Sequence, residues 1–231
     1  MTAITPGPAE QAARDLQVRR IIDDLARDYD DRFSREEVEA VYRDSHDRLT
    51  QTARVTTFLP VLAGRFACER LDARALAAGK RARRAPGVLF VCVRNAGRSQ
   101  LAAALLRHYA GSAIHVYTAG SDPAEAIHPE VLTATAEIGL SLELEFPKPL
   151  THDVVAAADV VVLLGCGDSC PVLPGRRYED WPVADPAGAS RDQVAAIRAD
   201  LDSRVRALIA SLLPELELPA PLAPPAPVAT R

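Results

Sequence analysis

The sequence lacks the features that mark membrane, secreted and nucleic-acid-binding proteins. No apolar run approaches the 18 residues that suggest a membrane-spanning helix, and residues 1–6 have neither the basic head nor the apolar core of a signal peptide. The net charge is only −4, so no positive excess favours nucleic acid. Four cysteines without a secretion signal fit a reducing cytoplasm. We therefore expect a cytoplasmic protein with no membrane or nucleic-acid partner.

Lysine is also scarce, since only two of the 27 basic residues are lysine. Together with the abundance of alanine and arginine, this scarcity indicates a high-GC genome. The rest of the composition, 48% hydrophobic and 25% charged, is that of an ordinary globular protein. A length of 231 residues allows one large domain or two small ones.

The first third of the chain predicts three amphipathic helices. Apolar residues recur at helical spacing between residues 16 and 29, 38 and 49, and 58 and 71. Ser34 and Glu37 form a capping box ahead of the second helix, and Pro60 fits the first turn of the third. We predict an all-α three-helix bundle over residues 1–79, in which Cys68 is a buried structural thiol.

From residue 87 onward, short apolar runs alternate with helical patterns. The basic stretch 80–86 ends in Pro-Gly and is predicted to be a linker. Strands are expected at 88–91, 114–119, 159–164 and 178–181, and helices from 99 and at 129–138, 151–157 and 190–213. This alternation predicts an α/β domain with an open parallel sheet over 87–213. Residues 214–231 hold six prolines and are expected to form a disordered tail.

The most informative stretch follows the first predicted strand and runs from Cys92 to Ser99. A buried strand that ends in a thiol, a short loop and a helix start would surround the sulfur with unpaired backbone N–H groups. The helix dipole and the planar fork of Arg98 would add positive field, which binds an oxyanion and favours the ionised thiolate. The residues expected to bind the oxyanion are Val93, Arg94, Asn95, Ala96, Gly97 and Arg98.

Two further features lie where carboxyl ends of strands are predicted. Asp185 precedes Pro186, which forces the aspartate into an extended or turn conformation and points its carboxylate off a loop. Cys166 and Cys170 follow the apolar run 159–164, on the side of the sheet where Cys92 is expected.

The thiol pair leaves three interpretations open. Disulfide exchange with a nearby thiolate is the first. A zinc site is the second, but it needs two more ligands, for which His152 and Asp168 are weak candidates. Chemically inert thiols are the third.

The pattern C-x5-R-S resembles the phosphate-binding loop of low-molecular-weight protein tyrosine phosphatases and of the arsenate reductases built on the same fold. Asn95 matches the loop asparagine of that family, whereas Arg94 and Gly97 depart from its usual Gly and Cys. The resemblance covers roughly residues 87–213 and implies a low-molecular-weight phosphatase fold. It also implies that Cys92 is the nucleophile, that Arg98 clamps the anion, that Ser99 supports the sulfur and that Asp185 is the general acid.

The second thiol pair resembles the arsenate reductases of this fold more than the phosphatases. Segments 146–151 and 178–182 share that resemblance, although the gap between Cys166 and Cys170 is shorter than in typical thioredoxin-coupled members. The resemblance implies arsenate as substrate, no bound cofactor and no metal. Electrons would come from thioredoxin, or from mycothiol with mycoredoxin, a route that needs only Cys92.

Two other functions stay open at this point. A phosphatase acting on phosphotyrosine or a small phosphate ester would use the nucleophile, the arginine and the acid without the other thiols. An oxyanion-sensing regulatory protein would use the N-terminal bundle as its output. That bundle resembles segments found ahead of such domains in actinobacteria, and it could also mediate a homodimer.

Overall fold

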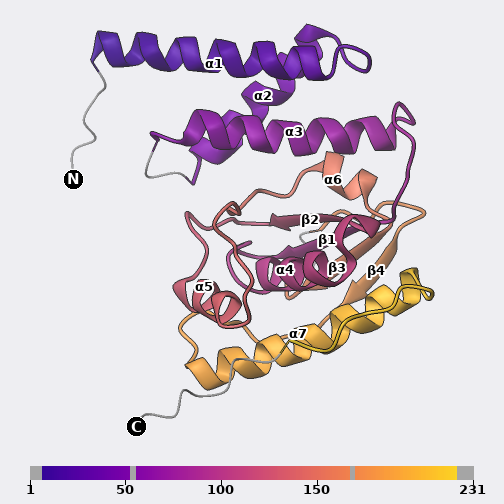
Figure 1. Ribbon diagram of the computed structural model, residues 1–231. Coiled ribbons are helices and arrows are strands. Elements are labelled where there is room, and N and C mark those ends of the chain that lie inside the picture. Colours follow the sequence, from indigo (N-terminus) through magenta and orange to yellow (C-terminus); the bar gives the residue numbers. More distant parts are fainter. Residues whose placement is uncertain (1–6, 53–55, 167–169, 223–231) are drawn as a thin grey trace. The chain divides into compact units, whose positions relative to one another are not determined.

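A computed structural model describes residues 7–52, 56–166 and 170–222 of the chain (Figure 1). The chain divides into two compact units, Met1–Ala82 and Arg83–Arg231. Within the described ranges, none of the helices has the length and apolarity that a membrane crossing requires.

Three helices form the N-terminal unit: α1 (Pro8–Asp28), α2 (Arg35–Thr50) and α3 (Leu59–Ala77). The predicted capping box is present, because the Ser34 side chain accepts from the Glu37 amide at 3.2 Å and the Glu37 carboxylate accepts from the Ser34 amide at 2.8 Å. The apolar faces of the helices bury a shared core, whose largest fully buried members are Tyr42, Phe66 and Leu71.

Two polar clusters inside this bundle are joined by hydrogen bonds or ion pairs. Arg70 is only 3% exposed, forms an ion pair with Asp44 at 2.7 Å and donates to Ser45 Oγ at 2.9 Å. Cys68 is partly buried rather than fully buried, and its Sγ lies 3.2 Å from the hydroxyl of Tyr29. Burial and the neighbouring Cys68 raise the pKa of Tyr29, so this phenol stays neutral.

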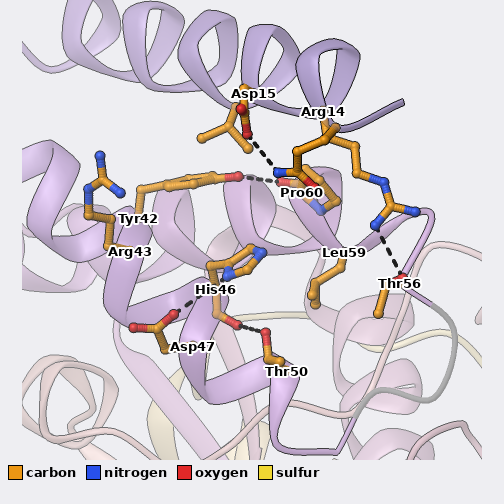
Figure 2. Close-up of a pocket in the computed structure, with 12 residues that line it drawn as sticks. Arg14, Asp15, Tyr42, Arg43, His46, Asp47, Thr50, Thr56, Leu59 and Pro60 are labelled. Carbon is orange, nitrogen blue, oxygen red and sulfur yellow. Dashed lines mark hydrogen bonds and ion pairs between the residues drawn. The ribbon is translucent and has the colours of Figure 1, made fainter. Parts of the chain in front are cut away.

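A cavity of about 440 Å³ lies between α1, α2 and the start of α3 (Figure 2). On its wall the Tyr42 hydroxyl donates to the Pro60 carbonyl at 3.3 Å, and Arg14 donates to Thr56 Oγ1 at 3.4 Å. Arg14 and Arg43 are each paired with a glutamate of their own helix, Glu10 and Glu39. The cavity is therefore mixed in charge, without a cluster of one sign.

Four parallel strands make the sheet of the C-terminal unit, in the order β2-β1-β3-β4. The strands are β1 (Gly87–Cys92), β2 (His115–Gly120), β3 (Val160–Leu164) and β4 (Arg177–Asp180). The helices are α4 (Arg98–Ala110), α5 (Pro129–Ala136), α6 (His152–Ala157) and α7 (Arg191–Leu212), with a 3-10 turn at Gly111–Ala113. The predicted fold class, an open parallel α/β sheet preceded by a helical bundle, is confirmed.

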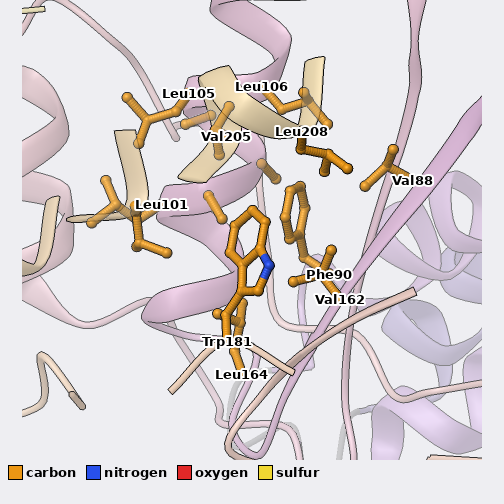
Figure 3. Packing of buried hydrophobic residues seen from close by; sticks show 14 of the residues in the cluster. Val88, Phe90, Leu101, Leu105, Leu106, Val162, Leu164, Trp181, Val205 and Leu208 are labelled. Carbon is orange, nitrogen blue, oxygen red and sulfur yellow. The ribbon is translucent and has the colours of Figure 1, made fainter. Parts of the chain in front are cut away.

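The apolar strands β1 and β3 lie at the centre of the sheet, as their continuous hydrophobic runs require. Alternate residues of both strands join α4 and α7 in one hydrophobic core (Figure 3). Within it, the rings of Phe90 and Trp181 meet with centroids 5.8 Å apart. In the strand register Cys92 lies beside both Gly120 and Leu164, so the carboxyl ends of three strands meet around the thiol.

The segment after α7 differs from the disordered tail expected from its prolines. Leu216, Leu218 and Leu222 pack against the core, and the Leu222 amide donates to the Tyr109 hydroxyl at 3.0 Å. Leucines spaced between the prolines supply the apolar surface that holds residues 214–222 against the domain. The remainder of the predicted tail, 223–231, lies outside the described residues.

The core of the C-terminal unit gives a test of the fold. Leu105 is fully buried between α4 and its neighbours, so Leu105→Ala should lower the free energy of unfolding by about 2–5 kcal/mol. Leu144 is 74% exposed, and Leu144→Ala should change that energy by less than about 0.5 kcal/mol. Chemical denaturation measures both, and equal losses would contradict the described packing.

Candidate active site

Cys92 is the last residue of β1 and only 2% of its surface is exposed. Its Sγ accepts a hydrogen bond from the Asn95 amide at 3.1 Å and lies 3.0 Å from the Ser99 hydroxyl. Both neighbours are fully buried, and Ser99 belongs to the first turn of α4. The structure thus brings a thiol, a backbone amide and a hydroxyl together at the start of a helix.

The carbonyl groups of the loop after Cys92 are held from outside the loop. The carbonyls of residues 92, 93, 94 and 96 accept from the amides of Ser121, Asp122, Ala124 and His128 at 2.8–3.2 Å. In a trans peptide the N–H points opposite to the C=O, so the amides of residues 93, 94, 95 and 97 point away from these outer contacts, and that of Asn95 donates to Cys92 Sγ. In the described part of the chain, the amides of Arg94, Ala96 and Gly97 donate to no protein atom. Such a set of amides suits an oxyanion.

Asn95 fixes the bend of this loop. It has φ of 47°, and it is the one non-glycine residue with positive φ among those described. Its side-chain amide donates to Ser99 at 2.9 Å and accepts from the Lys148 amide at 2.8 Å, while Gln100 Nε2 lies 3.2 Å from its oxygen. These contacts stabilise a conformation that asparagine tolerates better than most residues.

The two departures from the family pattern fit this geometry. Arg94 is exposed and forms an ion pair with Asp122, so its side chain points away from the loop interior. A Cβ on Gly97 would lie 2.8 Å from the Pro186 ring, so the missing side chain makes room for the segment that carries Asp185.

Arg98 and Asp185 meet at the mouth of the site. Arg98 Nη2 lies 2.8 Å from Asp185 Oδ2, and Nη1 donates to the Val183 carbonyl at 3.4 Å. Arg98 is mostly buried whereas Asp185 is half exposed. The other carboxylate oxygen accepts from the Ala187 amide at 3.1 Å, as expected for an aspartate at a turn. The predicted anion clamp and predicted acid are therefore in direct contact.

Cys166 and Cys170 lie close to the same end of the sheet. Cys166 comes two residues after β3, and its Sγ lies 3.7 Å from the carbonyl of Val91 in β1. Burial raises the pKa of Cys166, and the neighbouring charge of Cys92 acts in the same direction. Burial also raises the pKa of Cys170, to about 11, with a further contribution from Cys166. Both residues are free thiols.

The zinc interpretation of this region finds no ligand set among the described residues. Within those ranges no group of three or more His, Cys, Asp or Glu side chains could hold a metal. His152 is the first residue of α6, and Asp168 lies outside the described residues.

Two residues that shape the loop, Gly120 and Gln100, were not among the predicted site residues. Gly120 ends β2, and a Cβ there would lie 2.7 Å from the Val93 carbonyl. Gln100 is fully buried, and its Nε2 donates to the Asn95 carbonyl at 3.1 Å. A glycine directly after the predicted strand 114–119 was the available signal, since close backbone approach commonly requires one.

Comparison with known proteins gives matches to both units. Residues 87–218 match the family described as low molecular weight phosphotyrosine protein phosphatase, and residues 18–77 match the protein-tyrosine-phosphatase-like N-terminal domain. A thioredoxin-dependent arsenate reductase of Corynebacterium glutamicum has a similar solved structure. It is 46% identical with a TM-score of 0.77, over 84% of this chain and 96% of that one.

Two of the sequence relatives each align with about half of this chain. A glutaredoxin arsenate reductase of Synechocystis sp. is 30% identical over 128 residues, which is 54% of this chain and 97% of the relative. Arsenate reductase 1 of Staphylococcus epidermidis is 30% identical over 122 residues, which is 51% of this chain and 91% of the relative.

Substitution of Asn95 separates its backbone role from its side-chain role. Asn95→Gly keeps positive φ accessible but removes the buried hydrogen bonds, at about 1–3 kcal/mol of unfolding free energy. Asn95→Ala should cost about 1–2 kcal/mol more, because alanine resists the left-handed conformation. Denaturant unfolding of the two variants measures the difference, and identical losses would show that φ at this position carries no cost.

The raised pKa of Cys170 predicts a pH dependence of alkylation. The logarithm of its rate, measured by peptide mass spectrometry, should rise in proportion to pH up to about 11. In urea the same plot should level near the ordinary value of about 9, and an early plateau in the folded protein would contradict the assignment. Because the folded state keeps this proton longer, Cys170 should also make stability fall as pH rises from about 9 to about 11.

Proposed function

This chain belongs to the low molecular weight phosphotyrosine protein phosphatase family, and from that premise we propose that it reduces arsenate to arsenite. The observation that carries the proposal is a second buried thiol, Cys166, beside the strand that ends in Cys92. A phosphatase has no use for that thiol, whereas a reductase needs a sulfur that can attack the nucleophile's sulfur. The arsenate reductases named among its relatives support the same activity.

In the first step, arsenate sits against the amides of residues 93–98 and the guanidinium of Arg98. The Cys92 thiolate attacks arsenic and forms an S–As bond. One As–O bond breaks, and its oxygen leaves as water after receiving a proton from Asp185. Ser99 and the Asn95 amide, both in contact with Sγ, hold the sulfur in line for the attack.

In the second step, the Cys166 thiolate attacks Cys92 Sγ and forms a disulfide. The S–As bond breaks with its electron pair left on arsenic, so As(V) becomes As(III) and arsenite departs. Cys170 then attacks Cys166, which releases Cys92 as a thiolate and leaves a Cys166–Cys170 disulfide. Two cysteines four residues apart can satisfy the Cα separation of about 7 Å or less that a disulfide requires.

Thioredoxin is the favoured electron donor. It would reduce the Cys166–Cys170 disulfide by two electrons and return both residues to thiols. The thioredoxin dependence of the Corynebacterium glutamicum relative supports this choice. Mycothiol with mycoredoxin is the alternative, in which mycothiol attacks the arsenic adduct directly and the second and third cysteines are dispensable.

Cysteine-to-serine variants test the proposed relay. With thioredoxin, thioredoxin reductase and NADPH, the chain should consume NADPH in proportion to arsenate. Cys92→Ser, Cys166→Ser and Cys170→Ser should each lower the rate by at least about 10³-fold, because each removes an obligatory sulfur. Cys68→Ser is the matched control, since Cys68 lies in the N-terminal unit, and it should keep full activity.

The other outcomes of the same assay are informative. Full arsenate turnover by Cys166→Ser with mycothiol and mycoredoxin would show that this pair, and not thioredoxin, is the electron donor. The phosphatase function would be favoured by two results together. Arsenate would cause no NADPH consumption with either donor, and Cys166→Ser and Cys170→Ser would hydrolyse an aryl phosphate as fast as the unchanged chain does.

A further inference from the structure

Arg98 is held on more than one side. Its Nη2 contacts Asp185 and its Nη1 contacts the Val183 carbonyl, both on the segment after β4. Nη1 also lies against the backbone at Gly165, the residue between the end of β3 and Cys166. A Cβ built on Gly165 would come within 2.6 Å of Nη1 and 3.6 Å of the guanidinium carbon. The guanidinium therefore occupies the space in which a side chain at this position would begin.

Gly165 has a second reason to be glycine. Its φ is +70°, a left-handed conformation that residues with a Cβ resist. A side chain at Gly165 would have two separate effects. The left-handed φ would strain the backbone of the loop, and the added Cβ would displace the Arg98 guanidinium. Because the clashing atom is the far end of a flexible side chain, the guanidinium would move and the fold would stay intact.

We propose that Gly165 is a positioning residue for Arg98. Because Gly165 has no side chain, the Arg98 guanidinium can lie next to its backbone, which helps to hold the guanidinium in place to bind the oxyanion. This inference deepens the proposed function and rests on anion binding at the loop of residues 92–98. At Gly165, the segment that carries Cys166 therefore contacts the Arg98 guanidinium.

The same chain offers a matched control for backbone strain. Gly175, in the turn before β4, has φ of +75°, and a Cβ there would meet no atom within 4 Å. Gly165→Ala and Gly175→Ala therefore introduce similar strain, but only the first disturbs Arg98. The difference between the two variants isolates the contact with the guanidinium.

The test measures protection of Cys92 from iodoacetamide by inorganic phosphate, in the full-length reduced protein. Gly165→Ala should raise the half-protecting phosphate concentration about tenfold or more, the equivalent of one lost charge-assisted hydrogen bond, whereas Gly175→Ala should leave it within twofold. In an Arg98→Lys background, which lacks the Nη1 fork, Gly165→Ala should add no more than Gly175→Ala does. If Gly165→Ala acted by loosening the loop in general, its effect would not depend on the guanidinium at position 98 in this way.

Asparagine variants cover the case in which an alanine variant fails to fold. Asparagine tolerates positive φ yet carries a Cβ, so Gly165→Asn should weaken phosphate protection while Gly175→Asn should not. Equal protection of Gly165 and Gly175 variants would overturn the inference. Phosphate protection does not depend on arsenate turnover, so a wild-type chain that binds phosphate but never reduces arsenate would overturn the proposed function and leave this inference standing.

Discussion

The fixed direction of the peptide groups after Cys92 is the constraint on which the rest of the site depends. Amides of the segment 121–128 bind the loop carbonyls from outside, so the loop N–H groups converge on the opposite side, in front of the sulfur. A thiolate and an incoming oxyanion both need donors, and in the proposed reaction the same loop amides would serve both. The segment after β2 therefore shapes the proposed anion site through the carbonyls of the loop.

Much of this arrangement could be predicted because it is local in sequence. The central strands β1 and β3 are short apolar runs, and the capping residues Ser34 and Glu37 lie beside the helix that they start. The carboxyl ends of parallel strands meet at one edge, so a thiol after one strand and a thiol after its neighbour had to come together. Cys92 and Cys166 were therefore predictable as neighbours.

The remaining features depend on contacts that are distant in sequence. Arg98 and Asp185 are 87 residues apart, and nothing in the pattern around either residue indicates an ion pair between them. The outward hydrogen bonds of the loop come from backbone amides, which leave no trace in side-chain identity. The packing of residues 214–222 is distant in sequence as well, since composition does not show that its leucines lie against the core.

The charges around the thiols also give the proposed reaction its order. Burial raises the pKa of Cys166 and the charge of Cys92 adds to that effect, and the proposed S–As bond takes the charge off the Cys92 sulfur. Burial also raises the pKa of Cys170, and a charge on Cys166 adds to it until the proposed Cys92–Cys166 disulfide forms. Each proposed covalent step thus removes the charge of one sulfur beside the next nucleophile. Burial keeps both later thiols protonated until then, which limits premature disulfide formation in the resting enzyme.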